Sequence, residues 1–147
     1  VHLSLFPEAE VLKFDTKLTR NWELLVQLKS EVSKASEASR RNKVIGHSLD
    51  SIVKLELPPS YKDLIRNYED QLKFIFIVSR VELVESLDAE EKIYQSESLQ
   101  GVRICSQMHP GTKCERCWNY FGPDEQEGNS NGEICARCED NLQAAGA

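Results

Sequence analysis

The chain has 147 residues, of which 40% are hydrophobic and 29% charged, and its formal net charge is −6 at pH 7. These proportions are typical of a folded globular protein and exclude a disordered chain. The longest apolar run, FIFIV at 74–78, is much shorter than the ~20 residues of a membrane-spanning helix, so we expect no membrane partner.

The N-terminal segment carries no secretion signal, because VHLSLFPEAEVLKF has early acidic residues and lacks a basic start followed by an apolar stretch. The first residue is Val1 rather than Met, which suggests a piece of a longer protein. Pro7 predicts a loop before the first helix. An odd number of cysteines without an export signal favours a reducing compartment, where C-x-x-C pairs more often bind metal than form disulfides.

The first helix is predicted between Thr19 and Lys43. Its apolar residues recur at steps of three and four and form one stripe: Leu18, Trp22, Leu25, Leu28, Val32 and Ala35. Gly46 is a candidate for the helix stop, since glycine tolerates a left-handed cap. Basic charge is concentrated in this part of the chain, with ten Lys or Arg and six Asp or Glu in residues 13–62.

A strand, a helix and a second strand are predicted next. Apolar and charged residues alternate over 51–57, which predicts a strand that ends at the following prolines. Ser60 and Asp63 resemble a capping box at the start of a helix over 60–72. The β-branched and aromatic run FIFIVSRVELV predicts the second strand, so the unit is of the βαβ type with a right-handed crossover.

The remaining sheet residues follow an acidic segment. ESLDAEEK predicts a solvated turn, and GVRICSQM predicts a third strand of the same sheet. Residues 81–100 and 121–147 each carry six acidic residues and one basic residue. We therefore expect an α+β fold in three parts: a helical segment over 1–50, a small α/β subdomain over 51–108, and a cysteine-rich module over 109–147.

Four of the five cysteines form two C-x2-C pairs with seventeen residues between them, Cys114 with Cys117 and Cys135 with Cys138. Each pair can form a tight knuckle whose sulfurs reach one Zn²⁺ at ~2.3 Å, and four sulfurs close the shell of a structural, not a hydrolytic, metal. The module has few aliphatic core residues, so we expect it to need the metal to fold. Two disulfides are the alternative interpretation.

Other residues with metal or catalytic chemistry carry weaker signals. Cys105 is expected to be a small buried hydrophobic residue of a strand. His109 would compete as a ligand only if one of the four cysteines were not bound. His47, in the tripeptide IGH, is expected at the surface, since glycine-rich phosphate-binding context is missing. No Ser/His/Asp set is found, so no catalytic residue is predicted.

The motifs KCERCWNY and ICARC resemble the C-terminal zinc motif of bacterial-type isoleucyl-tRNA synthetase. VHLSLFPE is similar to the family's segment at the end of its anticodon-binding helices. NWELLVQLKSEVSKASEASRRNKVIGHSLDSIVKL resembles the next helix, turn and strand, and FIFIVSRVEL the following strand. The resemblance covers essentially all 147 residues, although the segment between the cysteine pairs, GPDEQEGNSNGE, departs from the family by being acidic.

The resemblance implies a class I aminoacyl-tRNA synthetase that joins isoleucine to tRNA(Ile) with ATP, in the bacterial cytoplasm or in an organelle matrix or stroma. The family's HIGH and KMSKS signatures and its editing domain are absent from these residues, so this piece would have no catalytic site of its own. Its implied role is to hold the tRNA anticodon stem-loop, as part of a monomer with one structural Zn²⁺. ATP and isoleucine would bind the upstream domains of the same enzyme.

Residues near the zinc and on the first helix are candidates for RNA contact. Loop bases are recognised by stacking on aromatic or guanidinium planes, and basic residues pair with phosphates. The candidates are Lys113, Arg116, Trp118, Asn119 and Arg137 around the metal, and Lys34, Arg40, Arg41 and Lys43 on the helix. Two plainer interpretations are open: Trp118 packs as a lid on the metal site, and the helix residues form an ordinary solvated face.

Two other functions are compatible with a four-cysteine module. The finger of a formamidopyrimidine-type DNA glycosylase has a similar motif, but a DNA-binding helical domain and a basic tail are expected there, whereas a βαβ unit and an acidic tail are found here. A protein-interaction module whose zinc replaces a core would bind no RNA at any salt. Phosphate contacts predict instead an RNA affinity that falls steeply as salt rises.

Overall fold

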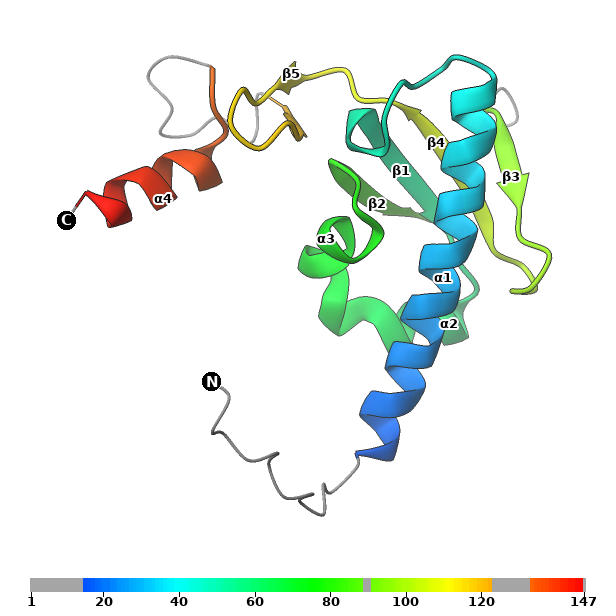
Figure 1. Ribbon diagram of the computed structural model, residues 1–147. Helices are drawn as coiled ribbons and strands as arrows, with labels where there is room; N and C mark the ends of the chain where they lie inside the picture. The colour runs from blue at the N-terminus through cyan, green and yellow to red at the C-terminus, as the bar shows by residue number, and fades with distance from the viewer. Residues whose placement is uncertain (1–14, 89–90, 123–132, 147) are drawn as a thin grey trace, which may run out of the picture.

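The computed structural model of the chain describes residues 15–88, 91–122 and 133–146 (Figure 1). The predicted loop at Pro7 and most of the acidic segment between the cysteine pairs lie outside these ranges. Within them, no helix is both long enough and apolar enough to cross a membrane.

The first helix, α1 (Thr16–Arg41), confirms the amphipathic helix predicted from the apolar stripe. Asp15 caps it, because its carboxylate accepts hydrogen bonds from the backbone N–H groups of Lys17 and Leu18 at 2.8 and 3.2 Å. The stripe divides in two along the helix. Leu18 and Trp22, near the start of the helix, are 46% and 45% exposed. The remaining members of the stripe are buried: Leu25, Leu28, Val32 and Ala35.

The helix stop predicted at Gly46 is wrong. The helix ends at Arg41 with Asn42 as its cap residue, and the next residue, Lys43, adopts the left-handed conformation with φ 57°. The backbone N–H groups of Lys43 and Val44 turn back to the carbonyls of Arg40 and Ser39, at 2.9 Å each. Backbone hydrogen bonds at the end of the helix therefore stabilise a non-glycine residue in the cap conformation.

The sheet has four strands in the order β2-β1-β4-β3. Its strands are β1 (Ser51–Glu56), β2 (Arg80–Val84), β3 (Ile93–Gln95) and β4 (Arg103–Met108). β1 and β2 are parallel, as predicted for a βαβ unit, and β4 pairs antiparallel with both β1 and β3. The third predicted strand is confirmed as β4, whereas the short edge strand β3 was not predicted.

The crossover between β1 and β2 corrects the sequence prediction for FIFIV. It consists of α2 (Pro59–Ile65), the 3₁₀ segment η2 (Arg66–Gln71) and α3 (Leu72–Phe76). Leu72 and Phe76, one helical turn apart, are buried, while Phe74 between them is 50% exposed. This helical burial period outweighs the β propensity of the run. Ile77 follows with φ 59°, and the strand begins only at Arg80.

The capping box predicted at Ser60 is also absent from the described start of α2. The helix begins at Pro59, with Pro58 as its cap residue and no side-chain capping bond. Proline suits the first helical position because its fixed φ is already helical and its missing N–H would have no partner there. Pro58 and Pro59 therefore define the start of α2, in place of the predicted Ser60 cap.

One hydrophobic core joins the helices to the sheet. α1, α2 and α3 lie on one face of the sheet (Figure 1), and their buried residues form a single cluster with those of the strands. Its fully enclosed members include Leu25, Leu28, Val53, Leu55, Ile65, Leu72 and Ile104. The predicted boundary at residue 50 falls between α1 and β1. Because both sides of it share this core, the unit that folds together includes α1 and the sheet.

The acidic segment after β2 packs on the sheet where the structure describes it. Leu87 is 5% exposed, and its N–H donates to the Glu56 carboxylate at 2.8 Å. Lys54 of β1 donates to Glu91 at 2.5 Å. The predicted solvated turn is therefore confirmed for the exposed Glu85, Ser86, Asp88 and Lys92 and wrong for Leu87 and Glu91, while Ala89 and Glu90 lie outside the described ranges.

A buried carboxylate connects α1 with β3 and the turn after it. Glu31 is 1% exposed and accepts hydrogen bonds from Lys34 Nζ at 2.7 Å, Ser96 Oγ at 2.6 Å and Tyr94 Oη at 3.2 Å. Burial raises the pKa of Glu31, but the hydrogen bonds from Lys34, Ser96 and Ser98 outweigh it and lower the pKa from 4.5 to about 2.

Glu31→Gln is expected to lower the free energy of unfolding at pH 6 by about 3 kcal/mol, the amount that corresponds to this pKa shift. Because the folded-state pKa is depressed, the stabilisation is fully present above pH 4.5 and is lost as pH falls toward 2. Denaturant titrations at several pH values measure the difference between the two proteins, which should shrink between pH 5 and 3. Glu23→Gln on the exposed side of α1 is the control; a difference that stays constant with pH would contradict the assignment.

Candidate metal centre

The four paired cysteines converge, as their spacing predicts. Their Sγ atoms all lie within 4.8 Å of one another, at 3.8 Å between Cys114 and Cys138 and 3.7 Å between Cys117 and Cys135. A tetrahedron with metal–sulfur bonds of ~2.3 Å has edges of ~3.8 Å, so the set fits Zn²⁺. A disulfide needs sulfurs ~2.05 Å apart, and all five cysteines are free thiols. The disulfide interpretation is therefore wrong.

The first cysteine pair lies in a knuckle between two short strands, β5 (Thr112–Lys113) and β6 (Tyr120–Phe121). The knuckle closes through backbone hydrogen bonds of 2.9 Å from Cys114 N–H to Asn119 O and from Trp118 N–H to Cys114 O. Trp118 has φ 65°, a left-handed conformation that turns the chain back toward β6. The spacing of the first pair thus produces a tight turn that exposes Trp118.

The second cysteine pair begins α4 (Ala136–Ala145), with Cys135 as the cap residue. The backbone N–H of Cys138 donates to Cys135 O at 2.8 Å, which forms the second turn. Cys114 Sγ accepts N–H groups from both turns, Cys117 N at 3.5 Å and Cys135 N at 3.4 Å. N–H donors aimed at sulfur stabilise a thiolate, which is the form that binds metal.

The four thiols differ in acidity. Burial raises the pKa of Cys114, but backbone N–H groups outweigh it and bring this pKa below its ordinary value. Burial also raises the pKa of Cys117, but hydrogen bonds from Asn119 outweigh it and lower this pKa to about 6. Burial raises the pKa of Cys138 and that of Cys135, the latter to about 12, and the nearby Cys117 charge adds to the effect. A divalent cation that binds all four sulfurs must therefore displace protons from the second pair.

The module is attached to the sheet at its β1–β2 end. Ser79 Oγ donates to Leu49 O and accepts the Tyr120 N–H at 2.6 Å, so one hydroxyl joins three chain segments. Lys113 Nζ lies 3.6 Å from the Asp50 carboxylate. Gly111 permits the close approach of β6, because a Cβ there would lie 2.1 Å from Phe121 O.

The candidates for RNA contact around the metal differ in whether they are exposed or bonded within the protein. Trp118 is 63% exposed, so the interpretation of this residue as a lid on the metal site is wrong. The other candidates have partners in the protein. Arg116 Nη1 donates to Cys138 O at 3.2 Å, Asn119 Nδ2 donates to Cys117 Sγ at 3.4 Å, and the Arg137 guanidinium lies 5.1 Å from the Phe74 ring centre.

Three of the four helix candidates are paired with carboxylates of their own helix. Lys34 lies 2.7 Å from Glu31, and Glu37 is 2.5 Å from Arg40 and 3.9 Å from Arg41. Ion pairs at these spacings are typical of an ordinary exposed helix. The arrangement supports the plainer interpretation for Arg40 and Arg41, whereas Lys34 pairs with the buried Glu31. Lys43 lies just beyond the helix in its left-handed turn.

The residues with weaker signals occupy structural positions. Cys105 is 2% exposed, which confirms the prediction of a buried residue, and this burial raises the pKa of its thiol. His109 is 3% exposed, and its Nδ1 accepts the Gly111 N–H at 3.0 Å; it does not belong to the converging ligand set. His47 is exposed, as expected, and its Nδ1 accepts the Leu49 N–H at 3.2 Å.

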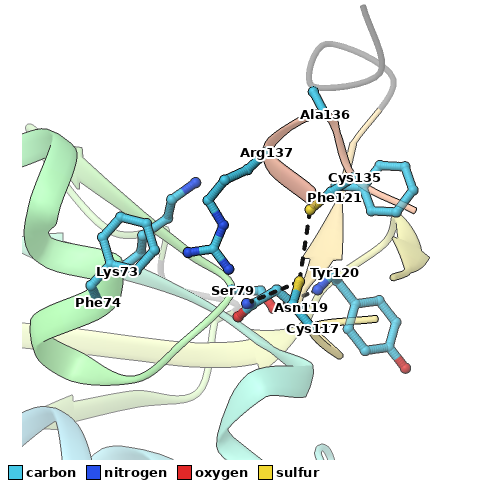
Figure 2. Close-up of a pocket in the computed structure, with 10 residues that line it drawn as sticks. All are labelled: Lys73, Phe74, Ser79, Cys117, Asn119, Tyr120, Phe121, Cys135, Ala136 and Arg137. Carbon is cyan, nitrogen blue, oxygen red and sulfur yellow. Dashed lines mark hydrogen bonds between the residues drawn. The ribbon is translucent and has the colours of Figure 1, made fainter. Parts of the chain in front are cut away.

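Sequence reasoning missed two residues next to the knuckle. Lys73 and Phe74 of α3 line a pocket of about 240 Å³ together with Asn119 and Arg137 of the cysteine module. Figure 2 shows Arg137 reaching down from α4 between α3 and the knuckle. The helical burial period of α3 was the signal that would have placed Phe74 at the surface.

Comparison with known proteins agrees with the resemblance. Residues 111–141 match the family described as "Zinc finger found in FPG and IleRS". The chain is 39% identical over 140 residues to the isoleucine–tRNA ligase of Geobacter sulfurreducens, covering 94% of this chain and 15% of that ligase. It is 38% identical over 139 residues to that of Syntrophotalea carbinolica, with coverage of 94% and 15%. It is 32% identical over 143 residues to the isoleucine–tRNA ligase of Persephonella marina, covering 97% of this chain and 15% of that ligase.

The chain therefore spans about 15% of the length of these curated relatives. The similarity extends well beyond the zinc finger match and includes α1 and the sheet. The resemblance to isoleucyl-tRNA synthetase is confirmed, and the family match together with the converging sulfurs supports zinc binding by the module.

Proposed function

We propose that this chain is the tRNA-binding C-terminal region of an isoleucine–tRNA ligase. It would hold the anticodon stem-loop of tRNA(Ile), while ATP-dependent aminoacylation takes place in upstream domains of the same monomeric enzyme. The observation that carries the proposal is Trp118, a large aromatic side chain held 63% exposed at the tip of a knuckle. An aromatic face presented in this way stacks on unpaired bases.

The metal would act by fixing these side chains in place. Cys114, Cys117, Cys135 and Cys138 would hold one structural Zn²⁺, which supplies cross-linking of the two turns and no hydrolytic chemistry. Four thiolates and one Zn²⁺ carry a net charge of −2. Lys113, Arg116 and Arg137 lie beside the ligands in sequence and would offset it, leaving an RNA-facing surface that is not repulsive to phosphate.

The relatives favour this function over the two alternatives. The zinc finger family includes proteins of the glycosylase type, but the named relatives match over 94% or more of the chain and are isoleucine–tRNA ligases. A purely structural module gives no reason for a half-exposed Phe74 and a more exposed Trp118 beside the metal site. The same proposal places the enzyme in the bacterial cytoplasm, or in an organelle that uses the bacterial-type enzyme.

Arg116→Ala and Arg137→Ala, each made in the full ligase, are expected to reduce kcat/KM for tRNA(Ile) by about tenfold, the scale of one lost charged contact to nucleic acid. Isoleucine activation, measured by ATP–pyrophosphate exchange, should be unchanged, because it takes place in other domains. Zinc content must stay at the wild-type level, since Arg116 also bonds Cys138 O.

Arg20→Ala, at the far end of α1, is the control for a lost positive charge and should leave both reactions unchanged. If activation falls as much as tRNA charging, these arginines have no RNA-holding role.

A further inference from the structure

The pocket between α3 and the first knuckle differs in composition from four other hollows on the described surface. We call it the α3–knuckle pocket; it is lined by Lys73, Phe74, Ser79, Cys117, Asn119, Tyr120, Phe121, Cys135, Ala136 and Arg137 (Figure 2). These described lining residues include two cations and three aromatic rings but no Asp or Glu. Four other hollows on the described surface each have at least one carboxylate residue in their lining. In a chain of net charge −6, cations and aromatic rings are thus gathered beside the metal site.

The two cations lie over one exposed ring. The Arg137 guanidinium lies 5.1 Å and Lys73 Nζ 5.5 Å from the centre of the Phe74 ring, which is 50% exposed. Cation–π contacts of this kind hold long basic side chains in a defined place. The ring and the guanidinium plane together form a platform on which a flat group can stack.

The opposite wall, largely apolar, presents the Asn119 amide as a polar group. Asn119 Nδ2 donates to Cys117 Sγ at 3.4 Å, which orients the amide. The amide oxygen is an acceptor for the N–H groups on the edge of a base. The volume of about 240 Å³ is below the ~300–1,000 Å³ of sites for drug-sized ligands, so the pocket suits one flat group rather than a whole cofactor.

We propose that the α3–knuckle pocket binds one unstacked base of a single-stranded RNA loop, together with its phosphate. The base stacks on Phe74 and Arg137, its edge faces the Asn119 amide, and Lys73 and Arg137 balance the phosphate charge. This inference rests on the proposed tRNA-binding function and adds α3, far from the cysteines in sequence, to the RNA-binding surface. Because Cys117, Cys135 and Arg137 form part of its wall, the pocket exists only when the metal module is folded against the sheet.

The test measures binding of the zinc-loaded chain to a synthetic anticodon stem-loop of tRNA(Ile) by fluorescence anisotropy. Phe74→Leu keeps an apolar side chain and removes the ring. It is expected to weaken binding by roughly five- to a hundredfold, the effect of losing one stacked base. Trp22→Leu, which removes an aromatic ring of similar exposure at the far end of α1, should bind within about twofold of the wild type.

Two further measurements locate the contact. Arg137→Ala removes both the positive charge and the planar guanidinium group, whereas Arg137→Lys removes only the planar group. Arg137→Lys should therefore recover the salt-dependent part of the affinity that Arg137→Ala loses, and no more. Stem-loops with 4-thiouridine placed singly along the loop should crosslink to α3 from one position only. Unchanged zinc content and circular dichroism establish that each variant is folded.

The possible outcomes distinguish a failure of the pocket proposal from a failure of the proposed tRNA-binding function. If Trp118→Ala weakens binding but Phe74→Leu does not, and no crosslink reaches α3, the pocket proposal is wrong and the tRNA-binding function stands. If the wild-type chain does not bind the stem-loop even at low salt, both are wrong.

Discussion

Replacing Cys138 with serine is expected to remove the metal and unfold the cysteine module while the sheet stays folded. Among the described residues of the module, those that are buried and cluster together are Cys114, Phe121 and Cys138, separate from the main core. So small a cluster supplies little hydrophobic stabilisation, whereas a structural Zn²⁺ supplies ~10–16 kcal/mol of binding free energy at pH 7. Loss of one ligand therefore removes most of what holds the module together.

Metal analysis and hydrogen exchange measure this result. Wild-type chain should contain close to one Zn²⁺, and Cys138→Ser much less. Exchange should increase over 112–122 and 133–146 and remain slow in β1 and β4. Cys105→Ser is the matched control, because Cys105 is equally buried but lies in the sheet. It should keep its zinc, and equal zinc loss in the two variants would overturn the assignment of ligands.

Leu28→Ala is expected to lower the free energy of unfolding by ~2–5 kcal/mol, because the side chain is fully buried between α1 and the sheet and its removal leaves a cavity. α1 and the sheet share one core, so both should unfold in a single transition at a lower denaturant concentration. Urea titrations followed by far-UV circular dichroism report the helix, and hydrogen exchange of β1 and β4 at the same urea concentrations reports the sheet.

Val26→Ala is the control for this substitution. Val26 lies on the same helix but is 61% exposed, so the change should cost less than about 0.5 kcal/mol. Two separate transitions, one for the helix and one for the sheet, would contradict the single core and support the division at residue 50.

The elements predicted best are those whose signal lies in a short stretch of sequence. The 3.6-residue period of α1 and the two C-x2-C pairs each determine their own local structure, and both are found as predicted. The errors lie where a local preference competes with packing. FIFIV has strand propensity, but burial of Leu72 and Phe76 in the core places its first three residues in α3, and the helix ends before Ile77. Lys43 replaces Gly46 as the left-handed residue because backbone hydrogen bonds hold it there.

The candidate site was only partly predictable for a different reason. Its metal ligands are close in sequence, whereas the α3–knuckle pocket brings Phe74, from the middle of the chain, together with Arg137 near the C-terminus. No spacing rule connects residues that far apart. The glutamate partners of Lys34, Arg40 and Arg41, by contrast, lie three or four residues away on the same helix, so these ion pairs could have been predicted from spacing alone.

The Ser79 hydroxyl, which joins the start of β2 to Leu49 and Tyr120, has a thermodynamic consequence for binding. With the Lys113–Asp50 pair, it restricts rotation of the knuckle about the chain that follows β4. A ligand that touches both parts then loses less orientational entropy on association, because the protein has already lost it on folding. Affinity gained in this way requires no additional contact, and a loosely tethered finger with the same surface residues would lack it.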